Sequence, residues 1–240
     1  MHLSGLEFAI ACAAIVIAAL VQGSIGFGLN LLSAPVIAIL NPHALPATLV
    51  MLSLPLSTTV SVRERHAIDV RPLRWMLLGA LPGTLIGLAI VQVVSGSELA
   101  IVVGAIALVG VVLSVVTPPI RVDARSASVA GVVSQTFGTA ASVGGPPVGL
   151  LYQHHGGPVI RSTLGAFFAL TGVLSLVGLI AVGKVAGWQA LLALALVPAM
   201  FIGFWLSRHL HGHVDRAWMR PAILVLSSLA GVAAIANGLF

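Results

Sequence analysis

Two stretches of the sequence decide the fold: QGSIGFGLNLLSAPV at residues 22–36 and SQTFGTAASVGGPPV at residues 134–148. Each stretch interrupts an apolar region with glycine and proline. Glycine allows the backbone to leave helical geometry, and proline suits the first turn of a new helix, where an N–H group would lack a partner. Each stretch therefore predicts a helix that ends within an apolar region and a second helix that starts there. Inside a membrane, such breaks are tolerated where they are buried in protein or line a cavity.

The composition around these breaks is typical of a membrane protein. Hydrophobic residues make up 59% of the 240 residues and charged residues only 7%. A soluble domain carries roughly 25% charged residues, so a surface with so few charges must face lipid. This excludes a soluble enzyme, a nucleic-acid-binding domain and a disordered tail. The net charge of +5 comes from basic residues spread over several loops, so we expect no nucleic-acid partner.

The apolar segments predict an all-α integral membrane protein. Because a helix needs about 20 apolar residues to cross the bilayer, the chain can hold about eight to ten membrane segments. Three segments, at 28–41, 128–140 and 146–153, are too short to span comfortably, and whether the first and last of these span or re-enter is left open. The predicted segments are 6–23, 28–41, 44–62, 75–94, 98–116, 128–140, 146–153, 158–180, 188–206 and 221–239.

The order of glycines and prolines repeats along the chain. At an offset of 112 residues, Gly26 matches Gly138 and Pro35 matches Pro147. The sequence therefore predicts two membrane repeats, each a Gly/Pro-broken hairpin followed by three spanning helices. The predicted divisions are a first repeat at 1–116, a cytoplasmic linker at 117–127 and a second repeat at 128–240.

The basic residues indicate that the two repeats have inverted topology. Cytoplasmic loops of membrane proteins carry an excess of Lys and Arg. This rule places the loop at 63–74 inside. Alternation along the chain then places 117–127 inside as well and brings all of the 11 Lys and Arg residues except Lys184 to that side. Equivalent loops of the two repeats lie on opposite faces as a result, and both termini lie outside.

Inverted repeats with discontinuous helices indicate a secondary transporter whose substrate site lies where the broken helices meet. A half-helix that starts at a break directs free N–H groups and a positive dipole end at the cavity, which forms an anion site without Lys or Arg. For each glycine or polar side chain alone, the alternative is a helix-packing contact or an interhelical hydrogen bond. The predicted substrate-binding residues are Ser24, Gly26, Gly28, Asn30, Ser33, Pro35, Gln135, Thr136, Gly138, Ser142, Gly144, Gly145, Pro146, Pro147 and Arg161, with Gln22 as a further candidate for the cavity wall.

Two features outside the breaks each have two interpretations. Arg161 either draws an anion towards the cavity or anchors its helix at the membrane interface. Gly79, Gly83 and Gly87 repeat every four residues and predict a smooth face for close helix packing, within one chain or between chains.

Ionisable residues are nearly absent from the middles of the segments. No Asp or Glu lies there, so we expect no carboxylate proton relay. Proton coupling would need His43, His154 or His155, or an anion carried in protonated form. The alternative for each of these histidines is an interfacial side chain hydrated by water.

The chain resembles the TauE/SafE (TSUP) family of sulfite and organosulfonate exporters in two signature regions. The matching segments are residues 22–36, residues 134–148, and Arg161 within PVIRSTLGAFFAL at residues 158–170. The resemblance extends from about residue 8 to residue 239. It implies a multi-pass transporter of small sulfur-containing anions in the bacterial inner membrane, and it does not fix the substrate, the direction or the coupling ion.

These features predict a secondary transporter of small anions that exports sulfite or a related sulfur oxyanion or sulfonate by alternating access. We expect no catalysis, no cofactor and no metal, since the alternating His209, His211 and His213 in a short basic loop are weak evidence for a metal site. One alternative is an intramembrane hydrolase, which needs Ser24 or Ser142 beside a histidine. The other is a membrane subunit of a larger complex. The expected partners are a small anion, the lipid bilayer and, in a homo-oligomer, further copies of the chain.

Overall fold

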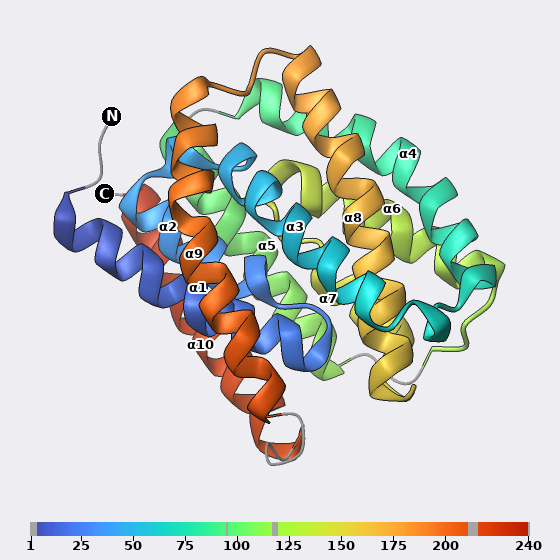
Figure 1. Ribbon diagram of the computed structural model, residues 1–240. Coiled ribbons are helices and arrows are strands. Elements are labelled where there is room, and N and C mark those ends of the chain that lie inside the picture. The colour runs from blue at the N-terminus through green and yellow to red at the C-terminus, as the bar shows by residue number, and fades with distance from the viewer. Residues whose placement is uncertain (1–3, 95, 117–119, 211–215, 240) are drawn as a thin grey trace.

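The computed structural model describes residues 4–94, 96–116, 120–210 and 216–239. Every regular element within these residues is a helix, which confirms the all-α class (Figure 1). The elements are α1 (Gly5–Ile25), α2 (Leu29–Leu40), η1 (Pro42–Ala44), α3 (Ala47–Arg63), η2 (Arg65–Ala67), α4 (Val70–Val93), α5 (Gly96–Val116), α6 (Ala124–Ala141), α7 (Gly145–Tyr152), α8 (Gly157–Ala181), α9 (Gly187–Leu210) and α10 (Arg216–Leu239).

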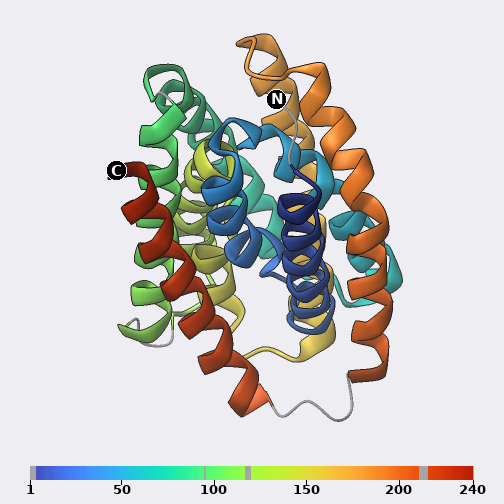
Figure 2. The ribbon, with the colours of Figure 1, turned by 90° about the vertical axis from the view of Figure 1, so that its left-hand side faces the viewer.

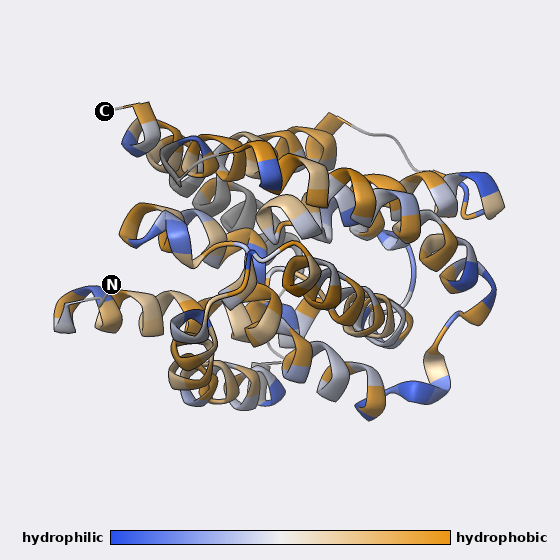
Figure 3. Ribbon diagram, turned by 90° about the horizontal axis from the view of Figure 1, so that it is seen from above, coloured by the Kyte–Doolittle hydropathy of each residue, from blue (hydrophilic) through white to orange (hydrophobic). Residues whose placement is uncertain are grey.

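The helices have the length and the surface of membrane spans. Four of those described, α1, α4, α8 and α9, are long and apolar enough to cross a membrane. Hydrophobic residues cover most of the length of the helices, and hydrophilic residues lie in short stretches (Figure 3). Leu85 on α4 and Leu194 on α9 are 69% and 68% exposed, as expected for side chains that face lipid. The chain is therefore a multi-pass membrane protein.

The short helices at the breaks match the prediction, whereas α6 is longer than predicted. α2 has 12 residues and α7 has 8, but the segment expected at 128–140 is an 18-residue helix. Asp123 and Ser126 form a capping box, with 2.8 Å from the Ser126 N–H to the Asp123 carboxylate and 3.0 Å from the Asp123 N–H to the Ser126 hydroxyl. Because this cap is formed by polar residues, α6 begins before the first residue of the apolar segment.

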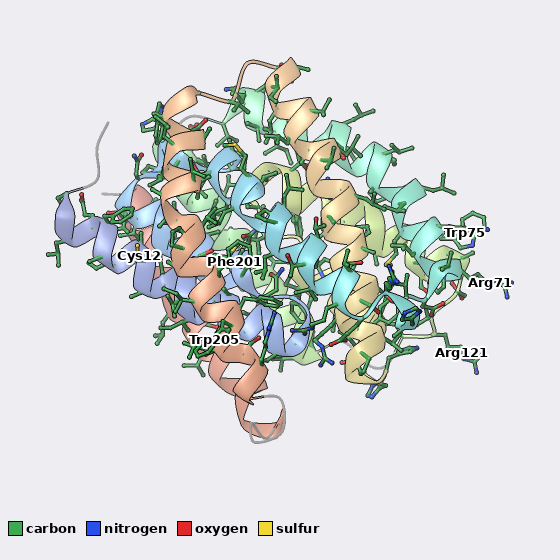
Figure 4. The ribbon with its side chains drawn as sticks, viewed as in Figure 1. Cys12, Arg71, Trp75, Arg121, Phe201 and Trp205 are labelled. Carbon is green, nitrogen blue, oxygen red and sulfur yellow. The ribbon has the colours of Figure 1, made fainter. Side chains whose placement is uncertain are left out.

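The arginines gather at one end of the bundle, which we call the basic end. Here α3 and α9 end, and α4, α6 and α8 begin. Arg71 and Arg74 already lie in the first turns of α4, although the sequence placed them in a loop at 63–74. Arg71 and Arg121 lie at the same corner of the molecule (Figure 4), whereas the connection from α8 to α9 that carries Lys184 lies at the other end (Figure 1).

The helices pack in pairs around two short elements. α4 packs along α6, α1 along α9, and α3 against α8 in the middle of the bundle. α10 lies along α5 and also contacts α2 (Figure 2). Every residue of α7 from Pro146 to Tyr152 is buried, so this short helix contacts protein on all sides. The two short helices therefore lie inside the membrane domain, where broken helices are tolerated.

The glycine stripe on α4 packs within the chain. Gly79, Gly83 and Gly87 face the backbone of α6. A Cβ atom on Gly83 would meet the carbonyl oxygen of Val132, and one on Gly87 would lie 2.9 Å from the carbonyl oxygen of Thr136. These glycines bring the two helices into backbone contact, and they contribute no group to the site described below.

Replacing Gly83 by valine should lower stability by about 1–3 kcal/mol or more, because the new side chain must push α4 away from α6. Thermal unfolding of the purified protein in detergent measures this loss as a lower melting temperature. The matched control is Gly187→Val, since a Cβ at Gly187 has no heavy atom within 4 Å. Equal melting temperatures for the two variants would contradict the packing role.

Candidate functional site

Both breaks expected from the sequence are present in the structure. α1 is capped by Gly26, which has a φ of 105°, and α2 starts after Gly28, which has a φ of 126°. Both values lie in the region that favours glycine, because a Cβ would be strained there. In the second half of the chain, α6 is capped by Ser142, which has a φ of 63°, and α7 starts at Gly145. Each break thus turns the chain within three residues and starts a second, shorter helix.

The two short helices start with different numbers of free donors. Pro146 and Pro147 occupy the first turn of α7, as the sequence predicts. Because proline has no N–H group, the backbone donors at this start are those of Gly144 and Gly145. The first turn of α2 has no proline, but the Leu29 N–H already donates to the Gln22 Oε1 at 3.0 Å, which leaves those of Gly28, Asn30 and Leu31. Both starts carry the positive end of a helix dipole.

A small cavity lies between the two breaks. The cavity has a volume of about 50 Å³, which suits a small oxyanion or a few water molecules. Its walls come from both breaks and from the middles of α3 and α8. No charged side chain is among the described residues that line it. An anion in this cavity would therefore be held by N–H and O–H dipoles.

Seven of the predicted substrate-binding residues line this cavity, together with Gln22. They are Gly28, Asn30, Gln135, Gly138, Ser142, Gly144 and Gly145. The prediction that the two breaks meet at one place is consistent with this geometry. Their role in substrate binding stays a prediction.

The other predicted residues lie outside the cavity wall. The Ser24 hydroxyl donates to the carbonyl oxygen of Leu20 at 2.8 Å, and the Ser33 hydroxyl donates to that of Leu29 at 2.7 Å. Both serines thus bond to their own helix. The remaining members of this group are Gly26, Pro35, Thr136, Pro146, Pro147 and Arg161.

Four hydroxyl side chains in the cavity wall were not predicted. Ser53 and Ser57 come from α3, and Thr171 and Ser175 come from α8. Each pair is spaced by four residues, so its members lie on one face of their helix. This spacing within two apolar segments is the signal that could have identified them.

Two glutamines connect the breaks to these hydroxyl groups in the same way. The Gln22 amide donates to the Ser57 hydroxyl at 3.2 Å, and the Gln135 amide donates to the Ser175 hydroxyl at 2.6 Å. Gln135 also donates to the Thr171 carbonyl oxygen at 3.1 Å. Gln22 and Gln135 are 5% and 3% exposed. Buried polar groups are normally satisfied, and here the bonds fix the orientation of the cavity wall.

Asn30 places an unsatisfied polar atom beside the cavity. Its Oδ1 is buried and has no hydrogen-bond partner among the described residues. A buried polar atom without a partner is costly, so its presence in the wall indicates a place for a polar ligand or for water. A half-turn of the Asn30 amide exchanges its oxygen and its nitrogen, so this side chain can also present an N–H donor to the cavity.

Arg161 lies at the basic end, outside the cavity. Its guanidinium forms an ion pair with Glu64, with 2.9 Å from Nη2 to Oε1. The partner comes from the end of α3, 97 residues away in the sequence. This contact agrees with an anchoring role and leaves the attraction of an anion as a prediction.

None of the described histidines lines the cavity. Among the described side chains, Ser24 and Ser142 donate to carbonyl oxygens, the latter to that of Pro46 at 2.9 Å, and neither is bonded to a histidine. No group of three or more potential metal ligands occurs among the described residues. The histidine tract at 209–213 lies outside the residues whose side chains are described.

One comparison with known proteins gave a match. The family model described as "Sulfite exporter TauE/SafE" matches residues 11–234. Neither the curated proteins nor the solved structures gave a match. The matched range includes both breaks, α3, α8 and all of the cavity wall.

Proposed function

The chain belongs to the TauE/SafE sulfite exporter family, and we propose that it exports sulfite or a related sulfur oxyanion or sulfonate through the cavity between its two breaks. The family assigns a membrane transporter of sulfur anions. The observation that carries the proposed site is the uncharged polar cavity where both broken helices meet α3 and α8. Substrate sites of transporters with discontinuous helices lie at such positions.

The chemistry of the wall suits a small oxyanion. The hydroxyl groups of Ser57 and Ser175 accept from the two glutamines and can donate to its oxygens, whereas those of Ser53 and Thr171 donate to carbonyl oxygens of their own helices at 2.9 Å and 2.8 Å. The starts of α2 and α7 direct their positive ends towards the anion. A transporter must release its substrate as well as bind it. Neutral donors give a weaker site than a buried arginine would, because they add no net positive charge to attract the anion.

We further propose alternating access between two inverted repeats. Two observations support this. The Gln22–Ser57 pair of the first half has an equivalent in the Gln135–Ser175 pair of the second half. The packing of α1 on α9 likewise has an equivalent in the packing of α6 on α4. Two such halves can exchange conformations, so that states open to either side have similar energies.

The proposed orientation places the basic end in the cytoplasm of a bacterial cell, with the protein in the inner membrane and both termini outside. The support is the concentration of arginines at that end. Assembly into a homo-oligomer and a role as a subunit of a larger complex stay predictions.

Flux into proteoliposomes tests the proposed function. Sulfite, thiosulfate, sulfoacetate and sulfate are each tested with and without a pH gradient. We expect saturable flux of at least one of them, well above that of empty liposomes. An effect of the pH gradient would identify proton coupling or a protonated substrate. Correctly folded protein that carries none of the four anions would contradict the assignment to sulfur anions.

A further inference from the structure

A cluster of charges joins four helices at the basic end. Glu64 at the end of α3 accepts from Arg161 of α8, with the Arg161 Nε at 2.9 Å from Oε1 and 3.0 Å from Oε2. The Arg161 Nη2 also lies 2.9 Å from Oε1. Arg63 lies 3.3 Å from the same carboxylate. The side chains of Arg161 and Glu64 are only 12% and 17% exposed, so this ion pair is largely shielded from water.

The same two arginines hold the last turn of α1, directly before the first break. The Arg161 Nη1 donates to the carbonyl oxygen of Ser24, and the Arg63 Nη2 donates to that of Gly23, each at 3.4 Å. At Gly26, a Cβ atom would lie 2.8 Å from the Cα of Arg161. Because the end of a helix carries partial negative charge, arginines are favourable there. The ion pair and the break therefore form one connected unit.

This unit lies between the basic end and the cavity. Arg63 is six residues after Ser57 on α3, which corresponds to about 9 Å along the helix axis. Ser57 lines the cavity. The cluster therefore lies close to the cavity, on the side of the basic end.

The cluster has more positive than negative charge. Arg63 and Arg208 both lie over the ring of Phe204, at 5.1 Å and 5.5 Å from its centroid. Arg63 and Arg161 share one carboxylate, that of Glu64. The Nη1 of Arg63 is buried and has no hydrogen-bond partner among the described residues. An unpaired buried donor beside excess positive charge fits an additional anion.

We propose that this cluster is a second binding site for the substrate oxyanion, and that Glu64 is the built-in anion that the substrate displaces from Arg161. An oxyanion presents two oxygens to a guanidinium as a carboxylate does. When it takes the place of Glu64 and binds the free Nη1 of Arg63, the contacts to Ser24 and Gly23 are released. The last turn of α1 can then move and open the way to the cavity. The identity of the anion rests on the proposed function.

Among the described residues, the opposite end of the molecule has no ion pair equivalent to that of Glu64 and Arg161. There, the Ser142 hydroxyl donates to the Pro46 carbonyl oxygen at 2.9 Å, and the Gln189 amide donates to the His43 carbonyl oxygen at 2.7 Å. These contacts are neutral, and an anion does not compete for them as it competes for an arginine. Opening that depends on the anion is therefore expected at the basic end alone.

Two measurements test the proposal. The first is the labelling rate of a reporter cysteine, Ser53→Cys, in a Cys12→Ser background, with a small membrane-impermeant thiol reagent applied at the basic end and no sulfite present. Glu64→Gln should raise this rate at least about tenfold. Without the carboxylate of Glu64, the Arg161 guanidinium is no longer fixed in the position from which it holds the Ser24 carbonyl oxygen, so the last turn of α1 can move. The matched control is Asp69→Asn, a carboxylate at the same end that lies outside the cluster. The second measurement is the dissociation constant of sulfite, followed by tryptophan fluorescence without the thiol reagent.

Glu64→Gln should lower the dissociation constant of sulfite at least about tenfold, because the competing carboxylate is gone. The double variant Glu64→Gln/Arg161→Gln leaves no unpaired charge from this pair, so it remains informative if the single variant fails to fold. It should be labelled fast but should bind sulfite no more tightly than the wild type does.

The outcomes separate the two proposals. Sulfite transport by the wild type with unchanged labelling and binding in Glu64→Gln would show a fixed structural ion pair and overturn the second site alone. Tighter binding in the double variant would also overturn it, because Arg161 would then play no part. A wild type that neither binds nor carries any of the four sulfur anions would overturn the proposed function, and with it the identity of the anion.

Discussion

Replacing Gly138 by valine should abolish anion flux while the protein remains folded. Gly138 lies in α6 and lines the cavity. A Cβ at this position would lie 3.6 Å from the Gln135 Oε1 and 3.7 Å from the Gly144 Cα, which are ordinary contact distances. The added side chain therefore enters the cavity without pushing the backbone aside. Since that cavity is about 50 Å³, three additional carbon atoms leave no room for an oxyanion.

The expected loss is at least about 100-fold in flux, which corresponds to about 3 kcal/mol of binding free energy. Uptake of the anion found in the flux assay measures it, and thermal unfolding in detergent reports on the fold. Gly187→Val is the control, because it adds the same side chain where no heavy atom lies within 4 Å. Normal flux in a folded Gly138→Val protein would mean that the substrate passes elsewhere. Gly145 is a less informative position, since its Cβ would lie 2.9 Å from the Phe27 ring and would displace it.

The breaks could be predicted from the sequence because glycine and proline favour particular backbone conformations there. A left-handed backbone conformation favours glycine, and proline in the first turn favours a helix start, so Gly26, Gly28 and Pro146 mark the chain at the residue level. The start of α6 was predicted four residues too late, because Asp123 and Ser126 cap the helix with polar groups that a hydropathy pattern does not register. Local chemistry therefore fixed the breaks, whereas hydropathy alone misplaced a helix end.

The cavity wall was predicted only in part, for a tertiary reason. A serine in an apolar helix can bond to its own backbone, as Ser24 does, or face a cavity, as Ser57 does. The choice depends on which face meets a neighbouring helix, and that face is set by packing among α1, α3 and α8. The partner of Arg161 was missed for the same reason, since Glu64 lies 97 residues away in the sequence.

Replacing Gln135 by glutamate should also abolish anion flux, through charge rather than through size. The two side chains have nearly the same shape, but glutamate places a negative charge in a wall that has none among its described residues. Two like charges 4 Å apart repel by about 4 kcal/mol at an effective dielectric constant of 20, which is about 1000-fold in affinity. We expect flux at alkaline pH, where the new carboxyl is ionised, to fall to the level of empty liposomes.

Two controls separate this repulsion from other losses. Gln135→Met removes the bonds to Thr171 and Ser175 without adding charge, and each lost bond to a buried partner costs about 1–3 kcal/mol. Gln189→Glu adds the same charge at a side chain that is also buried, at 5% exposure, and that lies outside the cavity wall.

If the anion binds beside Gln135, Gln135→Glu must lose more flux than either control. Equal losses in Gln135→Glu and Gln135→Met would assign the effect to the hydrogen bonds between α6 and α8, and the site would then lie elsewhere. Equal losses in Gln135→Glu and Gln189→Glu would show that any buried negative charge stops transport. A larger loss of flux in Gln135→Glu than in both controls places the charge of the substrate in the cavity between the two breaks. The reason is that repulsion between the glutamate and the anion weakens with the distance between them, so the same charge at position 189 has a smaller effect.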